Sequence, residues 1–158
     1  MIIKRLTLAE HRALMTDFFY TVFTGEPWND DWSNTAQLDA YMTDLAGNAN
    51  SLCYGFFEDG ADGSTGGSSG GQMLALAIGS IKHWFRGTEY AIDELCVRTD
   101  MQGKGIGSAF LEALQNELAA QDIHTIYLET DDWVPAFEFY KKRGFIHIKE
   151  HVSLYKSF

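Results

Sequence analysis

Apolar and polar positions along this chain follow two periods, which predict where its helices and strands lie. A short β-type segment at residues 2–6 precedes Thr7, and Glu10 follows three residues later, which is the spacing of a helix-capping box. Mostly apolar side chains then recur every three or four residues, at Leu8, His11, Leu14, Met15, Phe18, Phe19 and Val22. This helical period predicts a first helix over residues 9–23.

The next part of the chain changes from a helical pattern to a strand pattern. Ser33 or Asn34 is placed to cap a second helix, whose apolar positions are followed by Gly47 as its stop. Three runs rich in apolar and aromatic residues then predict strands at residues 51–58, 73–85 and 90–97.

The second half repeats helices and strands in alternation. An apolar stripe every fourth residue predicts an amphipathic helix at residues 108–121, and a β-type run follows at 124–130. A helix starting at Pro135 is ended by Gly144, and two closing strands are expected at 145–148 and 152–155.

The resulting order is β-α-α-β-β-β-α-β-α-β-β, which predicts an α/β (α+β) fold. We expect a mixed central β-sheet flanked by helices, and such a sheet can splay where neighbouring strands stop pairing. Residues 59–71 are almost wholly Gly, Ser, Asp and Thr, so we interpret them as a flexible hairpin connection. We find no repeat and no second domain, and expect one domain over residues 1–158.

Composition and charge narrow the class of protein. Of the 158 residues, 46% are hydrophobic and 14% aromatic, which favours a packed core over disorder. The net charge of −10 argues against nucleic acid as a partner and suits a cationic or neutral small substrate. The two cysteines, Cys53 and Cys96, form no C-x-x-C pair, and we find no signal peptide or membrane span, so we expect a cytoplasmic protein.

A glycine-rich run between the strand at 90–97 and the following helix carries the clearest chemistry. A strand that turns through glycines into a helix leaves several backbone N–H groups pointing at one spot, where the helix dipole adds positive charge. Such a turn suits a phosphate or pyrophosphate, although it also occurs as a plain tight turn. The run matches neither the dinucleotide fingerprint nor the Walker pattern, because its glycines are wrongly spaced: Gln102, Gly103, Lys104, Gly105, Ile106 and Gly107.

These residues resemble the pyrophosphate motif of the GNAT superfamily of acetyl-CoA-dependent N-acetyltransferases, Arg/Gln-x-x-Gly-x-Gly/Ala. About forty residues downstream, the family expects Ala-x-x-Phe-Tyr-x-x-x-Gly-Phe, which residues 136–145 match. The element order also agrees, so the resemblance covers essentially the whole chain. One departure is Trp133, which stands where the family often has an Asn that contacts the pantetheine arm.

The resemblance implies acetyl-CoA (coenzyme A) as the cofactor. It places the backbone of the strand around Leu95 along the pantetheine arm, like an added strand. The residues that it assigns to the cofactor are Leu95, Cys96, Val97, Gln102, Gly103, Lys104, Gly105, Ile106, Gly107, Ser108, Trp133, Ala136 and Phe139.

Amine acetylation needs a base and a proton source for the leaving thiolate. Asp93 and Glu94 are the candidate bases, and adjacent strand residues point to opposite faces unless a bulge intervenes. A further likeness to aminoglycoside 6′-N-acetyltransferases, which carry an acid at the position of Asp93, favours Asp93 over Glu94; ion-paired or solvated roles remain alternatives. The family places a general acid at Tyr140, which is otherwise a credible core aromatic.

The loop between the first two helices joins acids with indole rings, a combination suited to an ammonium-bearing acceptor. The candidate substrate-binding residues are Glu26, Trp28, Asp30, Asp31 and Trp32, with stapling of the loop to the core as the alternative. The five histidines show no metal-ligand spacing, so no metal is expected.

The leading hypothesis is therefore an N-acetyltransferase that moves an acetyl group to a primary amine of a small, cationic acceptor by direct transfer in a ternary complex, with an aminoglycoside-like acceptor as a sub-hypothesis. A non-catalytic acyl-CoA-binding sensor and a peptide or protein amine acetyltransferase are the alternatives. Family members often dimerise, so the resemblance also allows a homodimer, and we expect no nucleic acid or membrane partner.

Overall fold

A computed structural model describes residues 1–59 and 71–158 of the chain. These form two compact units, Met1–Leu128 and Glu129–Phe158. Most of the Gly/Ser-rich stretch expected at residues 59–71 lies outside the described residues.

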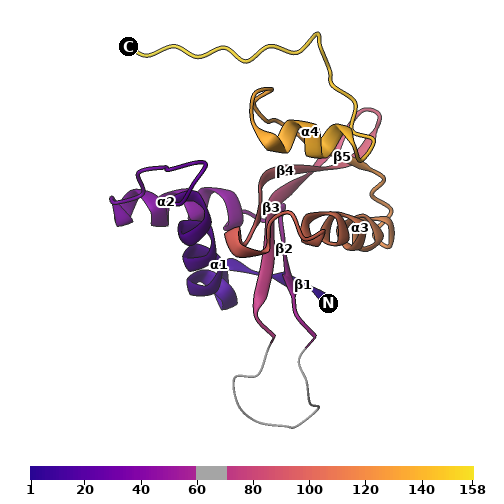
Figure 1. The fold of residues 1–158 in the computed structure, drawn as a ribbon. Coiled ribbons are helices and arrows are strands. Elements are labelled where there is room, and N and C mark those ends of the chain that lie inside the picture. The colour runs from indigo at the N-terminus through magenta and orange to yellow at the C-terminus, as the bar shows by residue number, and fades with distance from the viewer. Residues whose placement is uncertain (60–70) are drawn as a thin grey trace. The chain divides into compact units, whose positions relative to one another are not determined.

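The first unit is built on a five-stranded sheet (Figure 1). The strands follow one another in the order β1-β2-β3-β4-β5, with antiparallel pairing from β1 to β4 and a parallel β4–β5 pair. Their bounds are β1 Ile2–Leu6, β2 Ser51–Phe57, β3 Met73–Trp84, β4 Gly87–Val97 and β5 Thr125–Leu128. The mixed sheet expected from the sequence is confirmed.

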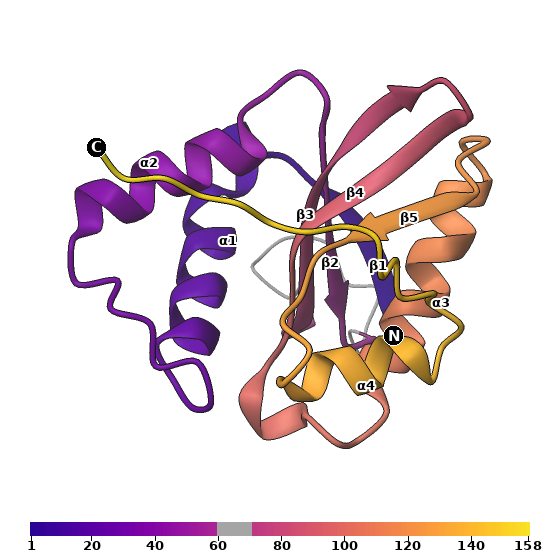
Figure 2. The same cartoon turned by 90° about the horizontal axis from the view of Figure 1, so that it is seen from above.

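Three helices cover the two faces of this sheet. Helices α1 (Leu8–Phe23) and α2 (Thr35–Ala46) pack on one face, whereas α3 (Ile106–Ala119) packs on the other (Figure 2). Thr7 caps α1 by accepting a hydrogen bond from the Glu10 amide, as predicted. Of the two candidate caps for α2, Asn34 holds the position and accepts from the Gln37 amide.

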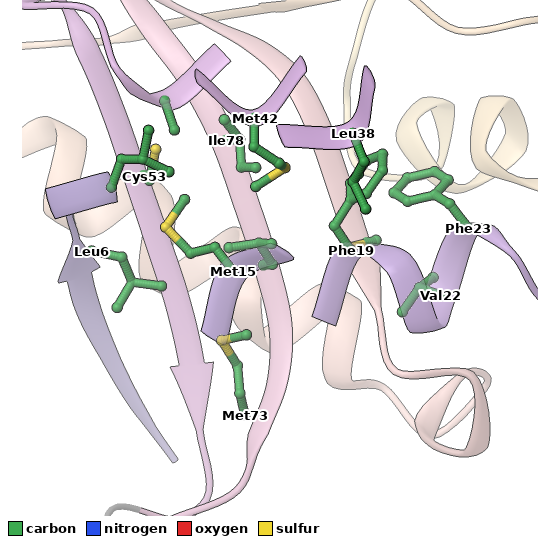
Figure 3. Packing of buried hydrophobic residues seen from close by; sticks show 14 of the residues in the cluster. Leu6, Met15, Phe19, Val22, Phe23, Leu38, Met42, Cys53, Met73 and Ile78 are labelled. Atoms are coloured by element: carbon green, nitrogen blue, oxygen red, sulfur yellow. The ribbon is translucent and has the colours of Figure 1, made fainter. Parts of the chain in front are cut away.

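The core lies mainly between the sheet and α1 and α2. Met15 and Phe19 of α1 and Met42 of α2 belong to one buried cluster with Ile78 of β3 (Figure 3). Leu76 of β3 is part of the same cluster, and all five side chains are nearly inaccessible to solvent. On the opposite face, the ring of Phe56 stacks on that of Phe110 of α3, with centroids 5.3 Å apart. Burial on both faces explains why β3 is an almost continuous apolar run instead of an alternating one.

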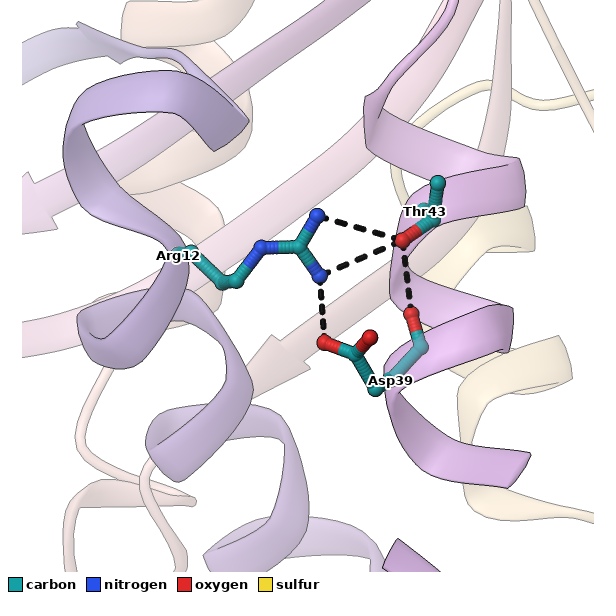
Figure 4. A network of polar contacts seen from close by, with 3 residues as sticks. All are labelled: Arg12, Asp39 and Thr43. Atoms are coloured by element: carbon teal, nitrogen blue, oxygen red, sulfur yellow. Dashed lines mark hydrogen bonds and ion pairs between the residues drawn. The ribbon is translucent and has the colours of Figure 1, made fainter. Parts of the chain in front are cut away.

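A polar contact links the outer surfaces of α1 and α2. The Arg12 guanidinium donates to an Asp39 carboxylate oxygen at 2.5 Å and to the Thr43 hydroxyl at 3.2 Å (Figure 4). All three groups are exposed, so the contact contributes little to the free energy of unfolding.

The second unit contains α4 (Pro135–Lys141), which Gly144 follows with a φ of 85°, in the left-handed region. The closing strands expected at residues 145–148 and 152–155 are not formed, and this part of the prediction is wrong. Leu154 and Tyr155 of the second expected strand are almost fully exposed. The alternating pattern is present, but a strand also needs a neighbouring strand to accept its backbone hydrogen bonds, and a local pattern cannot supply one.

Candidate functional site

The glycine turn connects β4 to α3 through a short 3-10 helix at Thr99–Met101. Gly103 and Gly105 have φ values of 72° and 84°, in the left-handed region that side-chain-bearing residues rarely adopt. A Cβ added to either glycine would meet no protein atom within 4 Å. The glycines are therefore required by backbone conformation, and the space in front of the turn is open.

The backbone amides of this turn remain available. Ser108 N and Ala109 N both donate to Gly105 O at 3.1 Å, whereas no hydrogen bond of the described residues uses the N–H groups of residues 103–107. The Gln102 side-chain amide donates to Val97 O at 3.2 Å and so ties the turn to the end of β4. Free amides at the N-terminus of a 14-residue helix are suited to paired phosphates, and the expected contact with the cofactor's pyrophosphate stays a prediction.

Strand β5 is shorter than β4, so its pairing with β4 stops before the glycine turn. β4 pairs with β5 only from Glu89 to Ile92. Beyond that point β4 continues to Val97 and stays paired with β3 alone, in the registers Leu95↔Ala77 and Val97↔Ala75. Among the described residues, no strand pairs with the side of residues 93–97 that is turned away from β3, and an unpaired strand edge is what the expected pantetheine contact needs.

A β-bulge places the two candidate bases. Glu94 is opposite Ile78 and Ile92 is opposite Gly79, so Asp93 is the extra residue of the bulge. A Cβ at Gly79 would lie 2.3 Å from Ala91 O, which explains why a glycine faces the bulge. This register shift breaks the regular alternation of β4, and here Asp93 is exposed whereas Glu94 is partly buried.

The Glu94 carboxylate has a hydrogen-bond partner that comes from helix α2 and not from a neighbouring strand. The Tyr41 hydroxyl of α2 donates to Glu94 Oε1 at 2.5 Å. Burial raises the pKa of Glu94, while the hydrogen bond from Tyr41 lowers it and the negative charges of Asp30 and Asp93 raise it. Burial also raises the pKa of Tyr41, so its phenol stays protonated and acts as the donor. For Asp93, burial raises the pKa and the nearby Lys82 lowers it.

The two tryptophans of the loop after α1 pack onto the core. Trp28 lies 5.8 Å from the ring of Phe23, and Trp32 lies 5.4 Å from Phe19 and 5.0 Å from Tyr41 between ring centroids. The stapling role that the sequence left open is therefore present for both indoles. Trp32 also contacts Tyr41, which donates to Glu94, whereas Trp28 packs on Phe23.

The three acids of the same loop differ in their surroundings. The charge of Asp30 acts on both Tyr41 and Glu94 and raises the pKa of each. Asp31 accepts a hydrogen bond from the Ser33 amide at 3.0 Å, and its contacts with Ser33 lower its pKa. Glu26 is exposed. Of the predicted acceptor residues, the structure brings Asp30 and Trp32 toward Glu94.

The remaining predicted site residues belong to the second unit. Tyr140 is buried, and its ring lies 5.2 Å from that of Phe139 and 5.1 Å from that of Phe145. Trp133 is 79% exposed. The roles assigned to these residues and to Ala136 stay predictions.

Tyr41 is the functional candidate that sequence reasoning missed. In the sequence it counts as one apolar position of a helical stripe, and it stands 53 residues from Glu94. Nothing in the local pattern separates a tyrosine that donates to an acid from one that only packs.

Among the residues that the structure describes, no group of three or more His, Cys, Asp or Glu side chains is arranged to hold a metal ion. Nor does any helix of the described ranges combine the length and apolar character needed to cross a membrane.

Comparisons with known proteins agree with this geometry. The model of the acetyltransferase (GNAT) family matches residues 11–145. No curated protein matches the chain.

Solved structures share the fold at low identity. An aminoglycoside acetyltransferase, HMB0005, from an uncultured soil metagenomic sample is 23% identical with a TM-score of 0.71, covering 99% of this chain and 98% of that one. The aminoglycoside 6′-N-acetyltransferase AAC(6′)-IG of Acinetobacter haemolyticus is 14% identical with a TM-score of 0.67, covering 100% and 99%. An acetyltransferase predicted in Clostridium acetobutylicum, solved with acetyl-CoA, is 20% identical with a TM-score of 0.65, covering 98% and 95%.

Proposed function

The chain belongs to the GNAT family of acetyltransferases, and on that basis we propose that it transfers an acetyl group from acetyl-CoA to a primary amine of a small cationic acceptor. The transfer is direct, within a ternary complex of protein, acetyl-CoA and amine.

One observation carries the proposal: the open segment of β4 has acids at one end and the glycine turn at the other. Asp93 and Glu94 lie where β4 leaves β5, and the free amides of residues 103–107 follow the end of the same strand. An extended ligand lying along residues 93–97 with its phosphates at the turn would present its far end to the acids.

The residues present fit coenzyme A. The amides of residues 103–107 would hold its pyrophosphate, and the open edge of Leu95 and Val97 would pair with its pantetheine arm. Cys96 is buried, with a thiol pKa raised by burial, so it contributes packing and not a nucleophile. Acetyl-CoA, when bound, supplies the acetyl group as an activated thioester.

The carboxylates of Asp93 and Glu94 are proposed to bind and deprotonate the acceptor amine. We assign Asp93 as the base or ammonium anchor, because its side chain can be reached from solvent and its partial desolvation raises its pKa, which strengthens it as a base. Glu94, which already accepts from Tyr41, is the second choice for that role. Tyr140 is proposed as the general acid, with its phenol as the proton source.

The acceptor class rests on charge and on similar structures. Asp30, Asp93 and Glu94 gather negative charge beside the rings of Trp32 and Tyr41, which favours an ammonium group. Two of the similar solved structures are aminoglycoside acetyltransferases, so an aminoglycoside-like amine is our specific proposal.

A thiol-release assay with acetyl-CoA and a panel of simple amines, polyamines and aminoglycosides tests this function. We expect turnover with at least one cationic amine. Coenzyme A binding by calorimetry without thiol release for any amine would instead indicate a binding module, and release only with basic peptides would indicate a peptide acetyltransferase.

A further inference from the structure

The contact between Tyr41 and Glu94 joins two elements that the proposed mechanism does not otherwise connect. Tyr41 lies on α2, on the side of the sheet that carries the acceptor loop, and Glu94 lies on β4 next to the bulge. A glutamate side chain has three rotatable bonds, and a strand position by itself leaves them free. The hydrogen bond from Tyr41 to Oε1 therefore selects one orientation of the carboxylate.

The ring of Tyr41 is itself held in place. Its centroid lies 5.0 Å from that of Trp32 and 5.7 Å from that of Phe19, and these two rings lie 5.4 Å from each other in an edge-to-face contact. The indole Nε1 of Trp32 is buried and has no hydrogen-bond partner among the described residues. Packing instead of a polar contact thus positions Trp32 against Tyr41, and Phe19 anchors both to the core.

The charged groups around Glu94 are negative. The titratable groups that face it are Tyr41 from α2, Asp30 from the loop after α1, and Asp93 and the Cys96 thiol from β4. The two charged ones are acids, and both disfavour the charged form of Glu94. A partly buried carboxylate in such surroundings gains most from an ammonium group that arrives with a ligand.

We propose that Tyr41 is a positioning residue, which fixes the Glu94 carboxylate as the group that binds the acceptor's ammonium, with Trp32 and Phe19 locking the tyrosine ring. This inference rests on the proposed function and adds a division of labour to it. Asp93 serves the amine that reacts, and the Tyr41–Glu94 pair binds positive charge on the acceptor.

The proposal predicts a specific pH response. Glu94 binds an ammonium only when deprotonated, and the Tyr41 hydrogen bond lowers its pKa against the effect of burial. Without the hydroxyl, the pKa of Glu94 rises further, so the acidic limb of kcat/KM for a cationic acceptor moves to higher pH. A tyrosine that merely packs would leave this limb in place.

Tyr41→Phe is the test, because it keeps the ring packed against Trp32 and removes only the hydroxyl. We expect KM for a cationic acceptor to rise roughly tenfold with kcat changed much less, the size expected for a lost hydrogen bond to a charged group. The affinity for desulfo-coenzyme A, measured by calorimetry, stays unchanged. Tyr20→Phe is the matched control, since Tyr20 is an exposed residue of α1, and it should leave all three quantities unchanged.

Two further measurements keep the outcomes separate. In Glu94→Gln, adding Tyr41→Phe should produce little further change in KM, because the two residues act as one unit. An active protein whose Tyr41→Phe variant keeps the wild-type KM and acidic limb would overturn the inference and leave the proposed function standing. A wild-type protein that releases no thiol with any amine would overturn both.

Discussion

The glycine turn and the cluster around Glu94 are built in opposite ways. The turn consists of consecutive residues, and its chemistry comes from backbone N–H groups whose direction is set by left-handed glycines. The cluster consists of side chains from α1, the following loop, α2 and β4, brought together only by packing. The comparison teaches that the expected cofactor site depends on two residues without a side chain, Gly103 and Gly105. The expected acceptor site depends instead on which side chains are brought together.

The largest effect should come from Asp93→Asn, which removes the proposed base and keeps its shape. We expect kcat to fall on the order of 10²–10⁴-fold in the thiol-release assay, while affinity for desulfo-coenzyme A is unchanged. Asp44→Asn, at an exposed position of α2, is the control and should keep full activity. A rate within about twofold of wild type would move the role of base away from Asp93.

Gly105→Ala tests the other half of the comparison. The new Cβ would meet no protein atom, but it strains a φ of 84° and enters the open space in front of the amides. We expect affinity for desulfo-coenzyme A, measured by calorimetry, to fall at least about tenfold because charged hydrogen bonds are lost. Gly87→Ala is matched to it, since Gly87 also has a positive φ and open space around it, at the start of β4. Equal losses in the two variants would mean that strain alone, and not ligand contact, is responsible.

A smaller effect is expected on the pH dependence of stability. The folded protein raises the pKa of Glu94 above its ordinary value, so the folded state holds that proton more tightly than the unfolded chain. The stabilisation from this proton is fully present below the ordinary pKa and is lost as pH rises through the raised one. Glu94→Gln removes this loss, so thermal unfolding should show the variant gaining stability relative to wild type as pH rises through that window. A difference independent of pH would show that Glu94 titrates normally.

The smallest effect is expected for Arg12→Met on the outer surface of α1 and α2. Its contacts with Asp39 and Thr43 are exposed, so the free energy of unfolding should fall by less than about 1 kcal/mol in urea titration. The KM of Arg12→Met for the acceptor should rise, as expected for Tyr41→Phe, only if the loss of this contact moves α1 relative to α2. A large rise in KM with normal stability would show that the cluster depends on this surface contact.

Part of the fold and site could be predicted from the sequence because the cause is local. The Thr7 cap, the turn at residues 102–107 and the helix end at Gly144 each follow from a few adjacent residues and their backbone preferences. The closing strands at 145–148 and 152–155 were predicted wrongly from equally local alternation, because strand formation depends on a partner elsewhere. The sequence allowed for a bulge at Asp93 and Glu94, but its place opposite Gly79, where Ala91 O leaves no room for a Cβ, is set by the neighbouring strand.

By itself, the sequence determined the order of elements through β5 and α4, the family, and the glycines that a phosphate-binding turn requires, because each is written in contiguous residues. Only the tertiary structure decided that Asp93 leaves the regular alternation of β4, that the pairing of β4 with β5 ends at Ile92, and that Glu94 meets Tyr41. These features join residues far apart in the chain, and the direction of a side chain across such a distance is set by packing, which no local pattern encodes.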